Sequence, residues 1–566
     1  MFISRSIFRS LFNPDPLPYD FEQWSKKPFT QRAKMICQAW ALQGFGAPLA
    51  AAFFYIIKIL AYILGWLFWC SFSEQLGNTS ELNLWWFKIE ALSKAIVWTI
   101  LVEVIGLGGG SGPLTGRYVP PFGGILYFLR PGTIRMAFRP GKNDASDKRT
   151  FGDVLLYLLL LISLILVLLS PQTGIFIAFP VILLLLNGLR DRTIFLAARA
   201  DIYLPMLLCI TFAFGYPESL TASLKLLWFG IWFWAAFSKL TPNFTSVITV
   251  MLCNSPLLKA KLFNSLKAKL FNAYPEDLRP SKTANYIAHF GTIIEFSMPL
   301  LLLFAGANTQ LLFIALSVLT AFHFFIFINF PMGVPMEWNV IMVYGGWVLF
   351  YIHPEVSIFA FGAVPIIIPL MLLFLLVLPI TGHLFPRKVS FLLSMRYYAG
   401  TWAYNVWLFK GDKKDKLDQH ITKTSKAPLK QAMMLYDETT SKSVISRIIA
   451  FRLMHLPGRM LNTLLPKAVS NLDEYNWADG ELVAGELLGW NFGDGHLSHE
   501  PLLRSVQKRC NYESGELRVI MVESPSFFTQ SIYWRIYDAN DGLIEQGIGN
   551  TSDLKQQLPW QASLTQ

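Results

Sequence analysis

The chain has few charged residues for its length. Only 15% of its 566 residues are Asp, Glu, Lys or Arg, whereas 53% are hydrophobic and the mean hydropathy is +0.42. A soluble core does not need so much apolar sequence, so the composition excludes an ordinary soluble domain and favours a multi-pass membrane protein. The net charge of +11 lies in loops and a C-terminal tail. We therefore expect it to meet the head groups of membrane lipids and not nucleic acid.

Paired cysteines and common catalytic motifs are also lacking. The five cysteines are scattered without paired spacing, which excludes a disulfide framework and a metal knuckle. Gly-x-Ser-x-Gly, His-Glu-x-x-His and P-loop sequences do not occur. The sequence thus names no reaction by motif.

Long apolar runs dominate instead. A helix that crosses a bilayer needs roughly 20 predominantly apolar residues. On this measure we predict about ten transmembrane helices, near residues 48–71, 91–109, 152–170, 174–189, 201–216, 221–239, 284–305, 309–329, 336–352 and 358–382.

Lysine and arginine lie almost entirely on one side of these runs. They cluster before the first run, between the second and third, the fourth and fifth, and the sixth and seventh, and after the tenth. Positive charge marks cytoplasmic loops. We therefore expect a protein of the inner (plasma) membrane with both termini in the cytoplasm. The exceptions are single lysines at the opposite ends of the second and sixth runs, namely Lys88, Lys94 and Lys225.

The predicted fold class is an all-α polytopic membrane bundle with a small cytoplasmic α+β C-terminal domain. The expected divisions are an amphipathic N-terminal segment, the transmembrane domain, an interfacial and linker segment rich in aromatic and basic residues, and the α+β domain. Their bounds are 1–47, 48–385, 386–443 and 444–566.

Strand patterns are clearest near the end of the chain. Residues 516–523 are rich in β-branched residues and 531–537 also contain aromatic ones, so both are predicted to be strands. Asp538-Ala-Asn-Asp-Gly542 supplies a hairpin turn before a third predicted strand at 543–549.

Polar residues inside the apolar runs are the main functional candidates, because they are expensive in a membrane. Lys239 ends the sixth run, Glu295 and His289 lie in the seventh, and His323 and Asn329 in the eighth. We expect Lys239, Glu295 and His323 to be catalytic, with His289 and Asn329 in binding. The structural alternatives are that Lys239 extends to the interface and that Glu295 and His323 pair only to hold helices together.

Two further segments contain candidate binding residues. After the glycine-rich run 106–112, Arg130 and Arg135 are candidates for binding lipid phosphates, although a plain connecting loop is equally compatible. In the tail, His496 and His499 resemble metal ligands. They have no third ligand at a recognisable spacing, so a turn before a helix is preferred and no metal is expected.

Several motifs resemble a bacterial multi-pass family of unknown function. They are Gly108–Arg117, Pro120–Gly124, Leu129–Thr133 and Gly489–His496. This resemblance covers most of the chain and implies a membrane location.

Residues 200–385 distantly resemble the horizontally transferred transmembrane domain that is shared with vitamin K-dependent gamma-carboxylases. The similar motifs are Ser-Lys239-Leu, the Gly-Thr-Ile-Ile-Glu295 segment, and Phe-His323 followed by Asn329-Phe-Pro. In those carboxylases the lysine of the matching motif is the base in quinol chemistry. The resemblance implies this role for Lys239.

The leading hypothesis is a membrane-embedded enzyme that acts on a quinone-like or lipid molecule in a cytoplasm-facing pocket. Lys239 would be the base or charge stabiliser, and Glu295 and His323 would handle the proton. Two alternatives stay open. One is a transporter of an apolar or weakly acidic solute, and the other is a non-enzymatic scaffold whose tail docks a protein partner.

Overall fold

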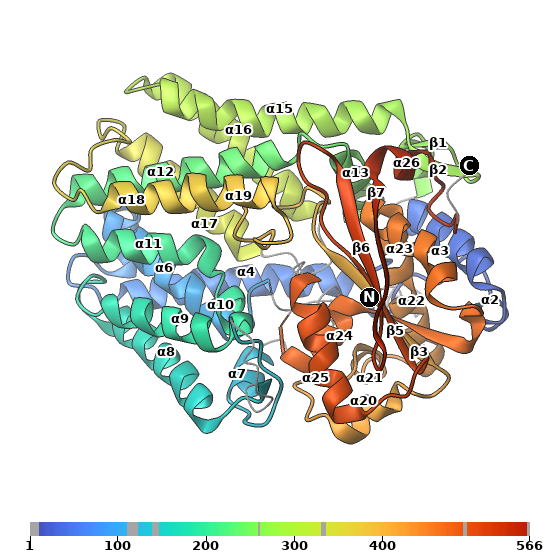
Figure 1. The fold of residues 1–566 in the computed structure, drawn as a ribbon. Coiled ribbons are helices and arrows are strands. Elements are labelled where there is room, and N and C mark those ends of the chain that lie inside the picture. Colours follow the sequence, from blue (N-terminus) through green and yellow to red (C-terminus); the bar gives the residue numbers. More distant parts are fainter. Residues whose placement is uncertain are drawn as a thin grey trace, which may run out of the picture.

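The computed structural model describes residues 11–109, 123–138, 147–258, 261–329, 336–490 and 495–562. Its helices form a bundle with roughly parallel axes, and a domain built on a β-sheet sits against one end (Figure 1). We call this end of the bundle the domain end. The opposite end, formed by the turns at 71–88, 170–177, 213–216, 305–308 and 353–366, is called the far end.

Six helices in the described residues are long and apolar enough to cross a membrane. They are α4 (Leu49–Cys70), α8 (Phe151–Leu169), α12 (Pro217–Ser238), α15 (Lys282–Phe304), α16 (Thr309–Ile328) and the continuous helix Ile367–Leu384, which comprises α18 (Ile367–Leu372), the π-helical η7 (Leu373–Val377) and α19 (Leu378–Leu384). Exposed leucine, isoleucine and phenylalanine cover their outer faces, as expected of surfaces that meet lipid.

The other four predicted runs also form helices, but shorter ones. They are α6 (Ile89–Val104), α9 (Ala178–Arg190), α11 (Ala200–Phe212), and α17 (Met336–Gly346) with the π-helical η6 (Trp347–Ile352). At about 1.5 Å of rise per residue, a helix of 13 residues such as α9 is shorter than a bilayer core. Of the ten spans that we expected, six are therefore confirmed as helices long enough to cross a membrane, and four form shorter helices.

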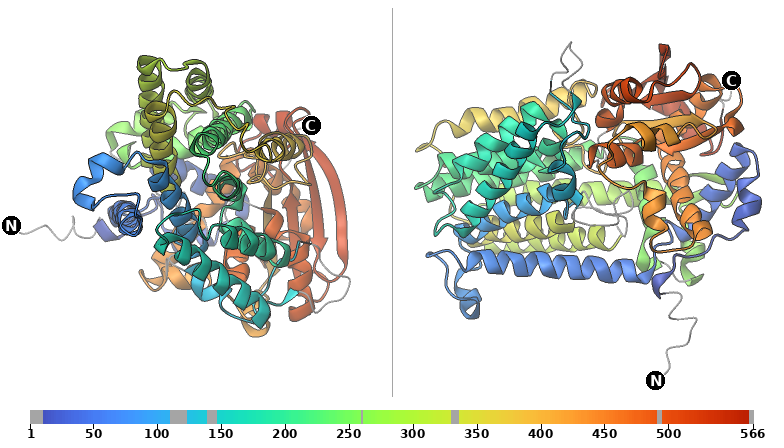
Figure 2. Two further views of the ribbon diagram at one scale, coloured as in Figure 1. Left: turned by 90° about the vertical axis from the view of Figure 1, so that its left-hand side faces the viewer. Right: turned by 90° about the horizontal axis from the view of Figure 1, so that it is seen from below.

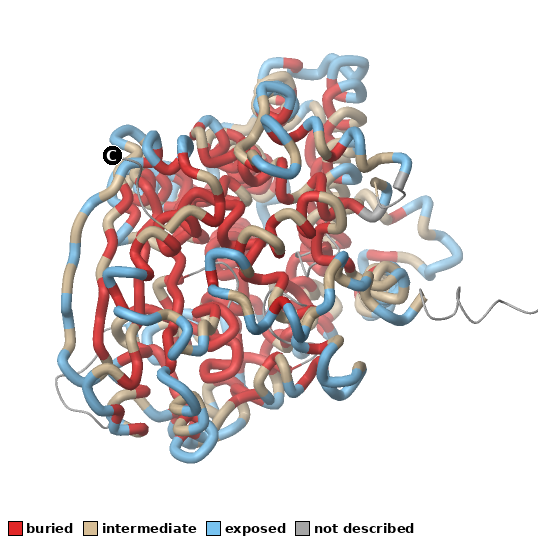
Figure 3. The backbone as a smooth tube through the Cα atoms, turned by 90° about the vertical axis from the view of Figure 1, so that its right-hand side faces the viewer, coloured by how far each residue is buried: buried red, intermediate tan, exposed pale blue. Residues whose placement is uncertain are grey.

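The sheet has the strand order β4-β3-β5-β6-β7, with every neighbouring pair antiparallel. Its strands are β3 (Tyr404–Lys410), β4 (Tyr475–Asp479), β5 (Leu517–Val522), β6 (Ser531–Asp538) and β7 (Gly542–Asn550). The three strands predicted near the end of the chain are confirmed as β5, β6 and β7. Figure 3 shows β7 as an exposed edge, with the buried strands beneath it.

Strand β3 differs from the sequence prediction. Its aromatic residues led us to expect an interfacial anchor, but Tyr404 and Trp407 are buried within the sheet. Runs of tyrosine and tryptophan are typical of both environments, and only the pairing with β4 and β5 separates them.

The smaller helices of this domain surround the sheet. They are α20 (Asp415–His420), α21 (Pro428–Ala432), α22 (Glu438–Met454), α23 (Leu456–Ala468), α24 (Gly480–Leu488), α25 (Glu500–Cys510) and α26 (Thr551–Gln556), with the 3-10 turns η8 (Leu472–Glu474) and η9 (Gly495–Ser498).

Two short elements, η1 (Thr79–Glu81) and α5 (Leu82–Trp85), belong to the far end. Further short elements lie at the domain end. They are α2 (Phe21–Ser25), α7 (Gly123–Phe128), α10 (Arg192–Ala197), α13 (Asn243–Asn254), η4 (Pro256–Leu258), η5 (Lys261–Phe263), α14 (Asn264–Ala268) and the hairpin β1 (Phe271–Ala273) and β2 (Asp277–Pro280).

The N-terminal segment packs on the C-terminal domain. Helix α3 (Phe29–Gln43) lies against α22, and the rings of Trp40 and Phe451 are 5.9 Å apart. Seen from below, α4 then runs along the side of the bundle away from this contact (Figure 2). The first and the last described segments thus both belong to the domain end.

Candidate functional site

Lys239 and Glu295 form an ion pair between two of the six long helices. Lys239 follows the last residue of α12, and Glu295 lies within α15. Both side chains are buried, and the Lys239 ammonium donates to both oxygens of the Glu295 carboxylate. Each charge therefore has its compensating partner in a place where an isolated charge would be strongly destabilised.

A largely apolar pocket adjoins Lys239. Asn329 lines it with Lys239, and its amide donates to the backbone oxygen of Phe325 at 2.7 Å. The remaining lining residues are Phe244, Val247, Ile248, Met251, Leu252, Ile287, Gly291, Phe322, Phe325, Ile326 and Tyr398. The pocket thus combines one ammonium with apolar walls from α13, α15 and α16, and its volume of about 70 Å³ has room for a small head group but not for a whole quinone or lipid.

His323 takes different partners from those we expected. Its Nε2 accepts a hydrogen bond from Trp232 Nε1 at 3.0 Å, and its Nδ1 is 2.9 Å from Asn339 Oδ1. Since the indole can only donate, the proton of the imidazole must lie on Nδ1, and the ring is neutral. Among the described residues the Glu295 carboxylate is paired with Lys239 and not with His323.

His289 lies apart from the ion pair although it shares α15 with Glu295. They are six positions apart, which places them about 120° apart around a helix of 3.6 residues per turn. The His289 side chain is half-buried. It therefore does not extend the Lys239 site.

Arg130 and Arg135 lie in another part of the domain end. Arg130 is exposed and donates to the backbone oxygen of Lys423 at 3.0 Å. Arg135 is buried and pairs with Asp153 at 2.9 Å, a residue that also caps α8. Arg130 thus connects the bundle to the C-terminal domain, and Arg135 holds its own segment against α8. Of the glycine-rich run 106–112, which we associated with them, residues 110–112 lie outside the described residues.

A second buried polar group joins α4, α6 and α17. Lys58 Nζ lies 3.6 Å from Glu337, and Glu103 accepts a hydrogen bond from the Gly109 amide at 2.9 Å. Both glutamates are buried. They lie outside the set of residues that line the Lys239 pocket.

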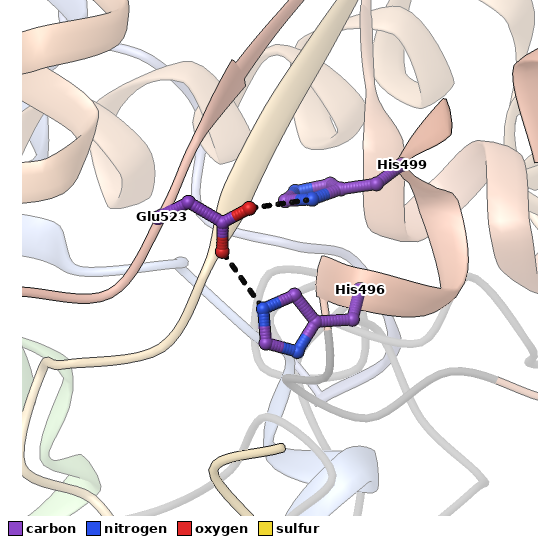
Figure 4. Close-up of side chains that lie close together, drawn as sticks. All are labelled: His496, His499 and Glu523. Carbon is purple, nitrogen blue, oxygen red and sulfur yellow. Dashed lines mark hydrogen bonds and ion pairs between the residues drawn. The ribbon is translucent and has the colours of Figure 1, made fainter. Parts of the chain in front are cut away.

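The two tail histidines have a third companion that the sequence spacing did not reveal. Glu523, directly after β5, lies 2.8 Å from His496 and 3.5 Å from His499. Figure 4 shows the carboxylate between the two rings. The predicted strand at 516–523 did end on this glutamate, but only the fold places it beside η9.

The comparisons with known proteins identify the family. The model of a family described as a transmembrane protein of unknown function (DUF3556) matches residues 10–565, so the chain belongs to this family. No curated protein and no solved structure matches the chain.

Proposed function

We propose that this transmembrane protein is a membrane-embedded enzyme that acts on a quinone-like or lipid molecule whose head group is held in the Lys239 pocket. The observation that carries the proposal is the Lys239–Glu295 pair at the wall of an apolar pocket between membrane helices. The distant resemblance of residues 200–385 to the carboxylase-type transmembrane domain supports the same assignment of Lys239.

The pair can serve either of two steps of proton chemistry. With the shared proton on Glu295, Lys239 is a neutral amine that accepts a proton from an acidic head group. With the proton on Lys239, the ammonium stabilises an oxyanion that forms beside it. In this scheme Glu295 returns the proton. His323, already hydrogen-bonded at both nitrogens, instead positions Trp232 and Asn339.

Access from the bilayer is consistent with the surroundings of the pocket. Ile287 lines it from α15, and the neighbouring Phe290 and Ile293 are 67% and 62% exposed on the same helix. An apolar molecule therefore has a lipid-facing route along α15 and does not have to cross water.

The test compares the molecules that co-purify with four forms of the full chain in lipid nanodiscs. Gly291→Leu places a side chain into the pocket, where an added Cβ meets only Phe322 at 3.8 Å. Lys239→Met with Glu295→Met removes both charges together, so no buried charge is left alone. Gly152→Leu, at an exposed helical glycine of α8, is the matched control.

We expect mass spectrometry to find a quinone or lipid enriched in the wild type and in Gly152→Leu, and depleted several-fold in both pocket variants. The same profile in all four forms would overturn the proposal. Flux of that molecule through reconstituted vesicles, without chemical change, would favour the transporter instead. A phenotype that depends only on the C-terminal domain would favour the scaffold.

We also propose that the domain end faces the cytoplasm of a bacterium. The five native cysteines are all buried, so an engineered cysteine can be labelled against a low background. Cysteine introduced at the far end by Glu355→Cys should react with a membrane-impermeant maleimide in intact spheroplasts. Cysteine introduced by Glu545→Cys in β7 should react only after lysis, and the reverse pattern would contradict this orientation.

A further inference from the structure

Two histidines and one glutamate of the C-terminal domain converge on one point. His496 belongs to η9, His499 directly precedes α25, and Glu523 follows β5. One nitrogen of each ring and a carboxylate oxygen all lie within 4.8 Å of one another. Ligands of a tetrahedral zinc ion lie about 3.4 Å apart, given metal–ligand distances near 2.1 Å. Small side-chain movements would therefore close the three groups around one ion.

The three groups are of types that bind metals. Imidazole nitrogens and carboxylate oxygens are both common ligands of first-row divalent ions.

The surroundings complete the geometry of a metal centre. Arg535 donates to Glu523 Oε1 at 2.8 Å, while Oε2 faces His496. Oε1 also lies 3.5 Å from His499, so each carboxylate oxygen faces one ring and Oε1 is oriented by an outer partner, as metal-binding carboxylates usually are. A pocket lined by Glu523, Arg535, Arg387 and Lys388 adjoins the cluster and supplies an entry path.

We propose that His496, His499 and Glu523 bind one first-row divalent metal ion. Two imidazoles and a carboxylate form a set that suits zinc with water in the fourth position, or ferrous iron with open positions. The competing explanation is a purely structural ion-pair cluster, in which Arg535 and the imidazoles only neutralise Glu523 and tie η9 to the sheet.

Metal titration of the full chain separates the two explanations. The protein is purified without a histidine tag, stripped with a chelator and titrated with Co²⁺ and then Zn²⁺. We expect about one ion per chain and a visible Co²⁺ absorption that Zn²⁺ abolishes. His496→Ala and Glu523→Gln should each weaken binding by at least about tenfold, while His420→Ala, at an exposed histidine of α20, should bind as the wild type does.

Metal-free thermal unfolding of each variant serves as the folding control. His496 is the decisive position, because its side chain is 20% exposed and its loss leaves the buried His499 in place. Unchanged affinity in His496→Ala and Glu523→Gln, or no stoichiometric binding by the wild type, would overturn the metal site and leave the structural cluster.

Discussion

The two ends of the helix bundle hold their buried cations in different ways. At the far end, lysine ammonium groups donate to backbone oxygens. Lys94 bonds the backbone oxygens of Val167, Leu168 and Ser170 at 2.7 to 3.2 Å, and Lys225 bonds those of His353 and Val356 at 2.6 Å. Lys88, which is exposed, bonds the Gln75 backbone oxygen at 2.7 Å in the same way. These are the three lysines that depart from the one-sided charge pattern.

At the domain end, by contrast, four buried cations pair with carboxylates, although Lys267 there donates to the backbone oxygens of Leu42 and Cys253. The pairs are Arg135 with Asp153, Arg149 with Asp191, Arg199 with Asp201, and Lys239 with Glu295. Each pair is close to neutral as a unit. Arg199 and Asp201 are two residues apart, whereas the members of the other three pairs come from segments that must pack together for the charges to meet.

The difference teaches what a lysine inside an apolar run can signify. Helices α8 and η6 end at the far end, where their last carbonyls lack partners within the helix and carry the negative end of the helix dipole. A lysine there donates to carbonyls, which do not take up its proton. Lys239 at the domain end faces a carboxylate with which it can exchange a proton. Only the second arrangement suits proton chemistry.

The largest expected effect comes from breaking a carboxylate pair. Arg149→Met leaves Asp191 buried without its cation, which lay 2.6 Å away. We expect a loss of about 3–5 kcal/mol in the free energy of unfolding, measured by denaturant titration in micelles. Arg149→Met combined with Asp191→Asn should recover most of this loss, because the amide oxygen can still cap α10. A single variant within 1 kcal/mol of the wild type would contradict this view.

Sequence reasoning found the polar residues of the bundle but not their partners. Lys239 and Glu295 stood out because charge is rare in apolar runs, and that cost is a local property. Whether Glu295 meets Lys239 or His323 depends on the rotation of α15 against α12 and α16, which composition does not encode. The pairing was therefore left to the structure.

The fold, like the candidate site, could be predicted only where its elements are encoded by neighbouring residues. Alternation and turn residues identified β5, β6 and β7, because hairpins are encoded locally. Strand β3 was missed, since its neighbours β4 and β5 lie far away in the sequence. The same distance hid Glu523 from His496 and His499. Short apolar helices such as α9 show that an apolar run alone does not fix the length of a helix.

A smaller loss is expected at the far end. Lys94→Met removes charge-assisted hydrogen bonds but leaves carbonyls, and no unpaired carboxylate, behind. Hydrogen bonds to charged groups contribute about 1.5–3 kcal/mol, so we expect a loss in that range by the same titration. Lys88→Met is the matched control, because its side chain is exposed and its loss should matter less. If Lys94→Met lowered the free energy of unfolding as much as Arg149→Met does, the proposed difference between the two ends would be contradicted.

The smallest expected effect concerns a carboxylate pair outside the bundle, where water screens the cations. Glu516, in the C-terminal domain, lies 2.6 Å from Lys413 and 2.5 Å from Lys416, whose side chains are 39% and 23% exposed. We expect Glu516→Gln to lower the free energy of unfolding by only about 1 kcal/mol at pH 7, the upper end for pairs with solvated lysines.

The pH dependence of this effect provides the sharper measurement. Burial opposes ionisation of Glu516, but the two lysines outweigh it and lower its pKa from 4.5 to about 2 in the folded state. Because the folded state then binds the proton less tightly than the unfolded state, the stabilisation is complete above pH 4.5 and declines as the pH falls toward 2. The difference between the wild type and Glu516→Gln should shrink over that interval. If the difference stayed constant down to pH 2, the contribution of Glu516 would come from packing and not from its charge. Glu516 would then no longer serve as a solvent-screened ion pair to compare with the buried pairs of the bundle.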